Sequence, residues 1–560
     1  MPLQPYVGDQ YLDMNAVTAW CQQAAAQMPR WARCETIGHT RGGRPITLLT
    51  ITDQPGSAPE RPGFWLDGGT HAAEFTGTMS AVYSASRWLS LLESGDEAAT
   101  AWFSRHAVYV VPCMCPDGMQ AMMDGAPFLR STLRPPPAAA VRTGLNPQDV
   151  DGDGEIRWMR WRHPAGPFVD DDVSPVAMRR RRIDDDPADA WFLCSEGMFL
   201  HWDGAVWRDA PREFAVDLNR NFPGHWQPFE MFGMHGGAFP TSEPESRAIV
   251  DAVAARPGIG AAVTNHTFTG ALLTQPYRSP SDLSAADVER MAILAEDAVR
   301  DTGYRAIRVH PDFVYDPNKP IVGVWADTMT SLFGFPAYTL ELWDPFTHCG
   351  VPMDNPAKFF VNPPAEVVSA IFSTFADDPG TRAWQAFDHP QLGAVELGGT
   401  RRLYTVRNPP QDLLAKECER GFLVADRVRR SLPRLEVEVA ATPLDGGLTE
   451  VTATLTNLGF LDTAGLQRAT KLAANPGIRL DLTLQGPQLL DGHTATQVPH
   501  LTGWGGLLVS GAGHPLGGGL GATGPRHRTR WLVSGSGHVE VRWTAPRAGS
   551  GSATIELPPR

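Results

Sequence analysis

The chain has 560 residues, which is too long for one small hydrophobic core and suggests two to four structural units. Hydrophobic residues make up 42% and charged residues 20%, as in ordinary soluble globular proteins. The formal net charge of −14 argues against nonspecific nucleic-acid binding, and no stretch approaches about 20 consecutive apolar residues, so we expect neither a nucleic-acid partner nor a membrane-spanning helix.

The first residues, MPLQPYVGDQ, lack the basic and apolar regions of a signal peptide. The seven cysteines are odd in number and scattered, which suits reduced thiols better than a disulfide framework. We therefore expect a cytoplasmic protein.

Helical and strand patterns alternate over the first 120 residues and again after about residue 258. Apolar strands interleaved with helices predict an α/β sheet that is covered on both faces. We expect strands at residues 44–53, 62–69, 106–114, 258–266 and 336–343, and helices at residues 11–28, 75–95, 284–303 and 412–432.

Residues 121–215 lack this alternation of helices and strands and are rich in Pro, Gly and residues of both charges. We interpret them as a long insertion of loops and short strands on the α/β core. Within it, Arg179 to Arg182 are followed by Asp184 to Asp186, which favours a solvated, self-compensating surface over a nucleic-acid patch.

The composition changes again at about residue 434. Apolar and polar residues alternate at period two in several short stretches, which Gly and Pro separate. This pattern predicts an all-β sandwich over residues 434–560. A Gly-rich loop at 510–525 lacks the strand–GK[ST]–helix context of a phosphate site.

His71 and Glu74 follow an apolar strand at a spacing of three residues. The pair could be polar residues of a surface turn or half of a metal site. Because ligands gather at the carboxyl ends of strands in α/β sheets, a third ligand should end another core strand, as His266 does. Two His and one Glu are a known catalytic zinc set, although a histidine at a strand end is more often structural.

Glu341 lies between two leucines in the strand at 336–343. A buried carboxylate needs a partner, so this residue either pairs with a core arginine or serves as a general base on metal-bound water. In the stretch DLNRNF, Asn219 and Arg220 could hold a carboxylate together, and Asp217 could accept the second N–H of a ligating histidine. A hydrogen-bonded turn is the alternative for this stretch.

Six short motifs occur in a characteristic order along the chain: HxxE from His71, CPDG from Cys115, DLNRNF from Asp217, SEPES from Ser242, NHTFTG from Asn265 and TLELWD from Thr339. In this order they resemble the M14 zinc carboxypeptidases over roughly residues 10–432. The resemblance implies a catalytic domain, residues 1–432, with a mixed sheet flanked by helices.

The same resemblance implies the roles of individual residues. Zinc is expected on His71, Glu74 and His266, with Glu341 as general base on zinc-bound water and Asn219 with Arg220 as the clamp on a terminal carboxylate. An arginine after PDG should stabilise the oxyanion, and Arg130 and Arg134 are the candidates. The chain departs from the family in two places: Ala73 stands where many members have arginine, and the nearest candidate for the carboxylate-capping tyrosine is Tyr315.

The stretch DVDGDG places Asp149, Asp151 and Asp153 at the first three acidic positions of a calcium loop, with Gly154 at its turn. Position 12 should be Glu but is Arg160, and no helical pair flanks the loop. An acidic turn stabilised by its own backbone and a calcium site completed by distant oxygens are both open.

We therefore expect a zinc metallocarboxypeptidase that hydrolyses C-terminal peptide (amide) bonds in a peptide or peptide-like substrate with a free carboxylate. One alternative is an amidase on the same scaffold that cleaves a non-peptide or cell-wall amide. Another is a catalytically silent peptide-binding protein. The sequence does not indicate an oligomeric state.

Overall fold

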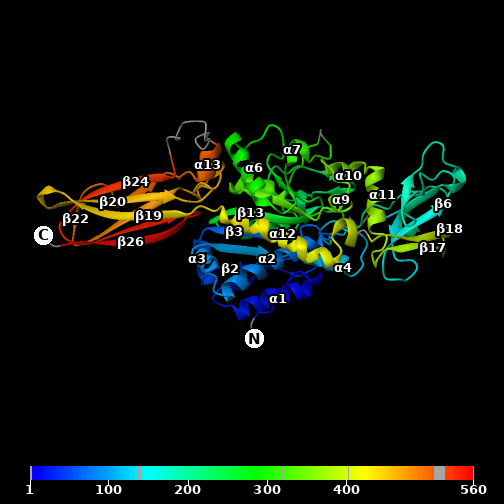
Figure 1. Cartoon of the computed structure of the whole chain (residues 1–560), viewed down its shortest axis with the longest axis horizontal. Coiled ribbons are helices and arrows are strands. Elements are labelled where there is room, and N and C mark those ends of the chain that lie inside the picture. The colour runs from blue at the N-terminus through cyan, green and yellow to red at the C-terminus, as the bar shows by residue number, and fades with distance from the viewer. Residues whose placement is uncertain (1–2, 136–140, 317–318, 402, 510–523, 559–560) are drawn as a thin grey trace.

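The computed structural model describes residues 3–135, 141–316, 319–401, 403–509 and 524–558. Figure 1 shows an elongated molecule with an α/β body in the middle, a sheet-containing lobe at one end and a β-sandwich at the other. Most of the Gly-rich loop predicted at 510–525 lies outside the described residues.

An eight-stranded mixed sheet forms the centre of the α/β body, which confirms the predicted fold class. Every residue of β3 (Gly63–Gly68) and β13 (Ile259–Thr267) is buried, as expected for strands that are covered on both faces. β3 pairs in parallel with β4 (Ala107–Val111) and β13, and β13 pairs in parallel with β16 (Ala337–Leu342). The sheet order is β1 (Ala32–His39), β2 (Pro45–Ile51), β4 (Ala107–Val111), β3 (Gly63–Gly68), β13 (Ile259–Thr267), β16 (Ala337–Leu342), β14 (Ala271–Thr274) and β15 (Arg305–Arg308).

Helices pack on both faces of this sheet. Phe64 and Leu66 of β3 belong to a hydrophobic cluster on one face, whereas Trp65 belongs to a cluster on the other. The first cluster includes residues of α1 (Met14–Gln27), α2 (Phe75–Glu93), α3 (Glu97–Phe103), α4 (Pro116–Met123), α6 (Ala285–Val299) and α12 (Gln411–Arg430). The second includes residues of α5 (Pro244–Ala254), α8 (Trp325–Thr328) and α10 (Ala357–Val361). No helix in the described part of the chain is long and apolar enough to cross a membrane.

The predicted insertion contains more regular structure than its sequence indicates. Its strands join a hairpin from residues 382–399 in a six-stranded antiparallel sheet, at the end of the molecule opposite the sandwich (Figure 1). The order is β17 (Arg382–His389), β18 (Gly393–Gly399), β6 (Trp158–Arg162), β9 (Trp191–Ser195), β7 (Phe168–Asp170) and β8 (Met178–Arg180). A separate pair consists of β5 (Gly144–Pro147) and β10 (Gly197–Leu200), and α11 (Ala365–Thr374) packs against β8.

The carboxyl-terminal residues form two four-stranded antiparallel sheets with a hydrophobic cluster of both sheets between them. One sheet contains β19 (Leu435–Pro443), β20 (Leu448–Asn457), β24 (Arg526–Ser534) and β22 (Gln488–Asp491). The other contains β23 (Ala495–Val498), β21 (Ile478–Gln485), β25 (Gly537–Ala545) and β26 (Gly549–Leu557). The sandwich packs against the α/β body, because Phe460, Leu461 and Leu466 belong to the core cluster of that body.

Candidate active site

His71, Glu74 and His266 meet at the carboxyl ends of two neighbouring parallel strands. β3 leads into His71, and its partner strand β13 contains His266. Nδ1 of His71 lies 2.9 Å from Oε1 of Glu74 and 3.1 Å from Nδ1 of His266. Nδ1 of His266 in turn lies 3.1 Å from Oε2 of Glu74, and all three side chains are buried. The structure thus brings together the three residues that the sequence indicated as metal ligands.

This donor set fits a zinc ion. Zinc binds imidazole nitrogen and carboxylate oxygen at about 2.0–2.2 Å in a tetrahedral arrangement, which separates neighbouring donors by about 3.3 Å. Two imidazole nitrogens that face each other at 3.1 Å can share at most one proton, whereas both can offer a lone pair to a cation. Burial lowers the pKa of His266 to about 4, so its ring is neutral at neutral pH, as a ligand must be. Although burial opposes ionisation, His71 and His266 hold the pKa of Glu74 well below its usual range.

Asp217 occupies the other side of the His71 ring. Its Oδ1 lies 3.2 Å from Nε2 of His71, and its Oδ2 accepts a hydrogen bond from Nε of Arg130 at 3.0 Å. Burial favours the neutral acid, but Arg130 and His71 outweigh it and hold the pKa of Asp217 well below its usual range. An ionised carboxylate on Nε2 fixes the tautomer of His71 that leaves Nδ1 available to a metal.

Glu341 lies directly opposite His266 in the parallel pair of β13 and β16. Its side chain makes no hydrogen bond or ion pair within the described ranges, so the core ion pair considered from the sequence is not seen there. Burial, together with the negative charge of Glu74, raises the pKa of Glu341 well above the usual carboxyl range. In its ionised form, a carboxyl group beside the candidate metal ligands can accept a proton from a neighbouring water molecule.

Asn219 and Arg220 lie in the 3₁₀ turn η3 (Leu218–Arg220) that follows Asp217. Oδ1 of Asn219 accepts a hydrogen bond from the backbone N–H of Trp325 at 2.9 Å, which leaves its amide N–H₂ group available as a donor. Arg220 packs over the ring of Phe229 and donates one N–H to the backbone oxygen of Asn219. Its Nε is buried without a hydrogen-bond partner in the described structure. Arg220 therefore has donors to offer to a ligand.

The two candidate oxyanion arginines differ in their surroundings. Besides its bond to Asp217, Arg130 has an Nη1 atom 3.5 Å from Oε1 of Glu74. Arg134 instead pairs with the buried carboxylate of Glu243, to which its Nε donates at 2.6 Å. Of the two, Arg130 is the arginine that contacts the triad.

Two residues near the site carry no metal-ligand or motif signal in the sequence. Arg407, at the end of η5 (Leu403–Arg407), has Nη1 3.6 Å from Oε1 of Glu74. The neighbouring Asn408 is buried and accepts the N–H of Thr76 at 3.0 Å while donating to the backbone oxygen of Ala73 at 2.8 Å, so it braces the backbone on both sides of Glu74.

Tyr315 lines the cavity that also contains Arg130 and Arg220. Burial raises the pKa of its hydroxyl group to about 12, so the group remains a hydrogen-bond donor at neutral pH. The sequence pointed to Tyr315 only by proximity. Its place beside Arg220 in the same cavity makes it a candidate for a contact with substrate.

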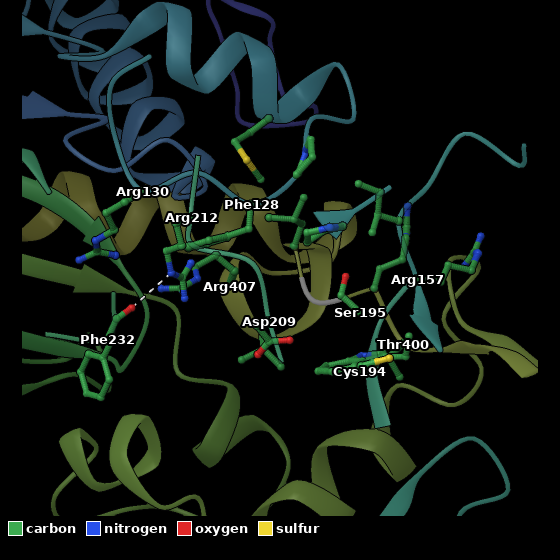
Figure 2. A pocket seen from close by; sticks show the side chains of 18 of the residues that line it. Phe128, Arg130, Arg157, Cys194, Ser195, Asp209, Arg212, Phe232, Thr400 and Arg407 are labelled. Carbon is green, nitrogen blue, oxygen red and sulfur yellow. Dashed lines mark hydrogen bonds between the residues drawn. The ribbon is translucent and has the colours of Figure 1, made fainter. Parts of the chain in front are cut away.

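A cavity of about 1780 Å³ runs from this site towards the insertion. Asp217, Arg220 and Phe268 line one part of it, and Trp158 and Cys194 of the insertion line another. Figure 2 shows Arg130, Arg212 and Arg407 with their guanidinium groups near one another, and Asp209, Ser195 and Arg157 farther along the cavity. The volume exceeds that of common small-ligand pockets, so more than one residue of a substrate can be accommodated.

The acidic loop of the insertion is held by its own backbone and by an arginine from outside the insertion. The carboxylates of Asp149, Asp151 and Asp153 lie close enough to share a cation, but they already have partners. Asp149 accepts backbone N–H groups from the loop, and Arg382 donates to Asp151 at 2.7 Å and to Asp153 at 2.8 Å. A calcium ion would have to compete with these bonds.

The family model described as "Zinc carboxypeptidase" matches residues 17–158 and 196–368. Together these ranges make up more than half of the chain, and the protein belongs to this family, the M14 peptidases. A second model, described as a domain of unknown function, matches residues 434–556.

Individual relatives match over shorter stretches. Carboxypeptidase B of Astacus astacus is 30% identical over 108 residues, which cover 19% of this chain and 33% of that protein. Zinc carboxypeptidase A 1 of Anopheles gambiae is 28% identical over 114 residues, which cover 20% of this chain and 25% of that protein. The chain thus spans only a third or less of these relatives' length. Among solved structures, bovine thrombin-activatable fibrinolysis inhibitor is similar with a TM-score of 0.41 and 15% identity, covering 75% of this chain and 96% of that chain.

Proposed function

We propose that the protein is a zinc-dependent carboxypeptidase that removes the last residue of a peptide or peptide-like substrate with a free terminal carboxylate. The observation that carries the proposal is the position of Glu341, opposite His266 in the sheet and without a structural partner in the described residues. A site that only bound peptides would not need a proton acceptor beside its metal ligands.

The proposed chemistry divides between the metal and the protein. Zinc on His71, Glu74 and His266 would lower the pKa of water to near neutrality and polarise the scissile carbonyl group. Glu341, opposite His266 in the sheet, takes the proton of the attacking water and passes it to the leaving amine. Arg130, close to Glu74, donates hydrogen bonds to the oxygen on which negative charge develops.

Selection of the terminal bond falls to Asn219 and Arg220. The guanidinium group of Arg220 offers two parallel N–H donors to a carboxylate, and the amide of Asn219 adds a third. The stacking of Arg220 on Phe229 and the bond between Asn219 and Trp325 hold both side chains in place before the substrate binds. A fixed clamp costs less conformational entropy on binding than two mobile side chains would.

An amidase that acts on a larger, non-peptide or cell-wall substrate is the second candidate. The observation that favours it is the cavity of about 1780 Å³, which extends well beyond the space needed for a single terminal residue.

The test uses the zinc-loaded full-length protein and a panel of peptides that differ in their C-terminal residue, with the products identified by mass. We expect loss of one C-terminal residue at a time, abolition of turnover by a chelator and recovery on adding zinc. Cleavage of amides other than the terminal peptide bond would favour the amidase. Binding of peptides without any cleavage would favour the silent binding protein and contradict the proposal.

A further inference from the structure

Arg212 and Arg407 come from distant parts of the chain and share one aromatic neighbour. The guanidinium carbon of Arg212 lies 5.0 Å from the centre of the Phe128 ring, and that of Arg407 lies 5.8 Å from the same ring. Arg212 belongs to the end of the insertion, whereas Arg407 follows the region that matches the zinc carboxypeptidase family. Both line the large cavity, and Figure 2 shows them between Arg130 and the insertion residues Asp209 and Ser195.

Positive charge exceeds negative charge along this part of the cavity. Most of the cavity's arginines have carboxylate partners, as Arg142 has in Glu213 at 2.9 Å. Arg212 makes no ion pair among the described residues, and its Nε donates only to the backbone oxygen of Phe232 at 3.3 Å. The negative charge of Asp209 acts on Arg212, but no ion pair joins the two side chains among the described residues.

Arg212 is exposed on the cavity side, and the positive charge of Arg130 acts on it. Burial and the positive charge of Arg130 lower the pKa of Arg212. Arg130 and Arg407 both approach Oε1 of Glu74, a carboxylate that the proposed function assigns to zinc. Binding of a cation at Glu74 would therefore increase the local excess of positive charge, which an anion from outside the chain can balance.

We propose that Arg212 and Arg407 form a binding site for a second carboxylate of the substrate, on the acyl side of the cleaved bond. The proposal rests on the proposed function, in which Arg220 holds the terminal carboxylate and Arg130 lies at the reacting carbonyl. From Arg130, the cavity continues past Arg212 and Arg407 towards the insertion, where the acyl part of a substrate must extend (Figure 2). The preferred substrates are thus acidic peptides or other acyl groups that carry a carboxylate.

The geometry of the two arginines suits this ligand. A guanidinium group that lies over an aromatic ring keeps its N–H donors at its edge, where they can meet a planar carboxylate. Arg212 is exposed to the cavity and needs no rearrangement of the core to reach a ligand. The guanidinium carbon of Arg407 also lies 4.9 Å from the centre of the Phe268 ring, and this contact restricts the arginine side chain.

The test compares two peptides that share their C-terminal residue and differ only in having Glu or Gln immediately before it. For the zinc-loaded wild type, we expect kcat/KM to be at least about 10-fold higher for the Glu peptide, the scale of one charge-assisted hydrogen bond. Arg212→Met and Arg407→Met should each reduce this ratio, and the double variant should bring it close to one. Arg180→Met is the matched control, since Arg180 lines the same cavity but donates to Asn362, and it should keep the ratio.

A second readout does not depend on turnover. Calorimetric binding of the two peptides to the Glu341→Gln variant should show the same preference for Glu over Gln. If wild type cleaves the Glu and Gln peptides with equal kcat/KM, the proposed acidic-substrate site is wrong. It is also wrong if Arg212→Met keeps the wild-type ratio of the two kcat/KM values. If no peptide of any kind is cleaved, the proposed function fails, while the binding preference still decides whether Arg212 and Arg407 hold a carboxylate. If the double variant does not fold, the Glu-to-Gln ratio of the single variant Arg212→Met decides, because the side chain of Arg212 is exposed and its replacement should leave the fold intact.

Discussion

Nε2 of His71 lies 3.2 Å from Oδ1 of Asp217, a residue 146 positions further along the chain. The contact links the HxxE motif to the DLNRNF motif and places Asp217 beside a candidate metal ligand. A carboxylate that accepts the Nε2–H of a histidine orients the ring and raises the basicity of Nδ1. Although Asp217 is buried, Arg130 and then His71 hold its pKa well below its usual range.

We predict that Asp217→Asn lowers zinc affinity by about 10- to 100-fold, because an amide stabilises the required tautomer less well than a carboxylate. Competition with a chromophoric chelator measures the affinity. Asp67→Asn is the control, since Asp67 is a buried carboxyl group of β3 whose described hydrogen bond is to Trp65. Unchanged affinity in Asp217→Asn would contradict the role assigned to Asp217.

Replacing Glu341 tests the proton acceptor. Glu341→Gln keeps the size of the side chain but removes its basicity, so we predict one zinc per chain as in wild type and a loss of turnover of at least about 100-fold. Zinc content by elemental analysis and turnover on the best peptide of the panel provide the two measurements. A zinc-loaded variant with nearly normal turnover would rule out Glu341 as the base.

Asp67 should make stability depend on pH. Burial raises its pKa from 3.8 to about 8 in the folded protein, so the folded state binds this proton more tightly than the unfolded state. The stabilisation by the protonated group is fully present below about pH 4 and is lost as the pH rises towards 8, by up to about 5 kcal/mol. We predict that Asp67→Asn unfolds at a higher temperature relative to wild type at pH 8 than at pH 5. A difference between the two proteins that does not change with pH would contradict this prediction.

The response of the protein to calcium distinguishes the two interpretations of the acidic loop, an acidic turn and a calcium site. Because Arg382 and backbone N–H groups already occupy the carboxylates of Asp149, Asp151 and Asp153, we predict that calcium does not raise the unfolding temperature of metal-stripped protein. A ligand that bound only the folded state would raise it. A calcium-dependent increase that disappears in Asp151→Asn would instead establish a calcium site.

The sequence indicated which residues come together at this site because each of them lies in a recognisable local pattern. His71 and Glu74 form one motif, and His266 and Glu341 each lie in a continuous apolar strand of a parallel sheet. Parallel pairing then places such residues side by side at the same edge of the sheet, as the opposition of His266 and Glu341 shows.

Contacts across long stretches of chain could not be predicted in this way. Arg407 approaches Glu74 from a short irregular turn with no hydrophobic periodicity. The sheet of the insertion was missed because β7 and β8 have only three residues each, and because β17 and β18 join it from residues 382–399, outside the predicted boundary. β1 was also missed, since Arg33 and Glu35 interrupt its apolar pattern at the sheet edge.

The central claim is that the protein recognises a free terminal carboxylate through Arg220 and cleaves the adjacent bond. The most direct measurement compares kcat/KM for one peptide and its C-terminally amidated form, in zinc-loaded wild type and in Arg220→Ala. We predict that wild type cleaves the free acid about 30- to 1000-fold faster than the amide, and that Arg220→Ala loses this preference at unchanged zinc content. An amidated peptide cleaved as fast as the free acid by wild type would contradict the account.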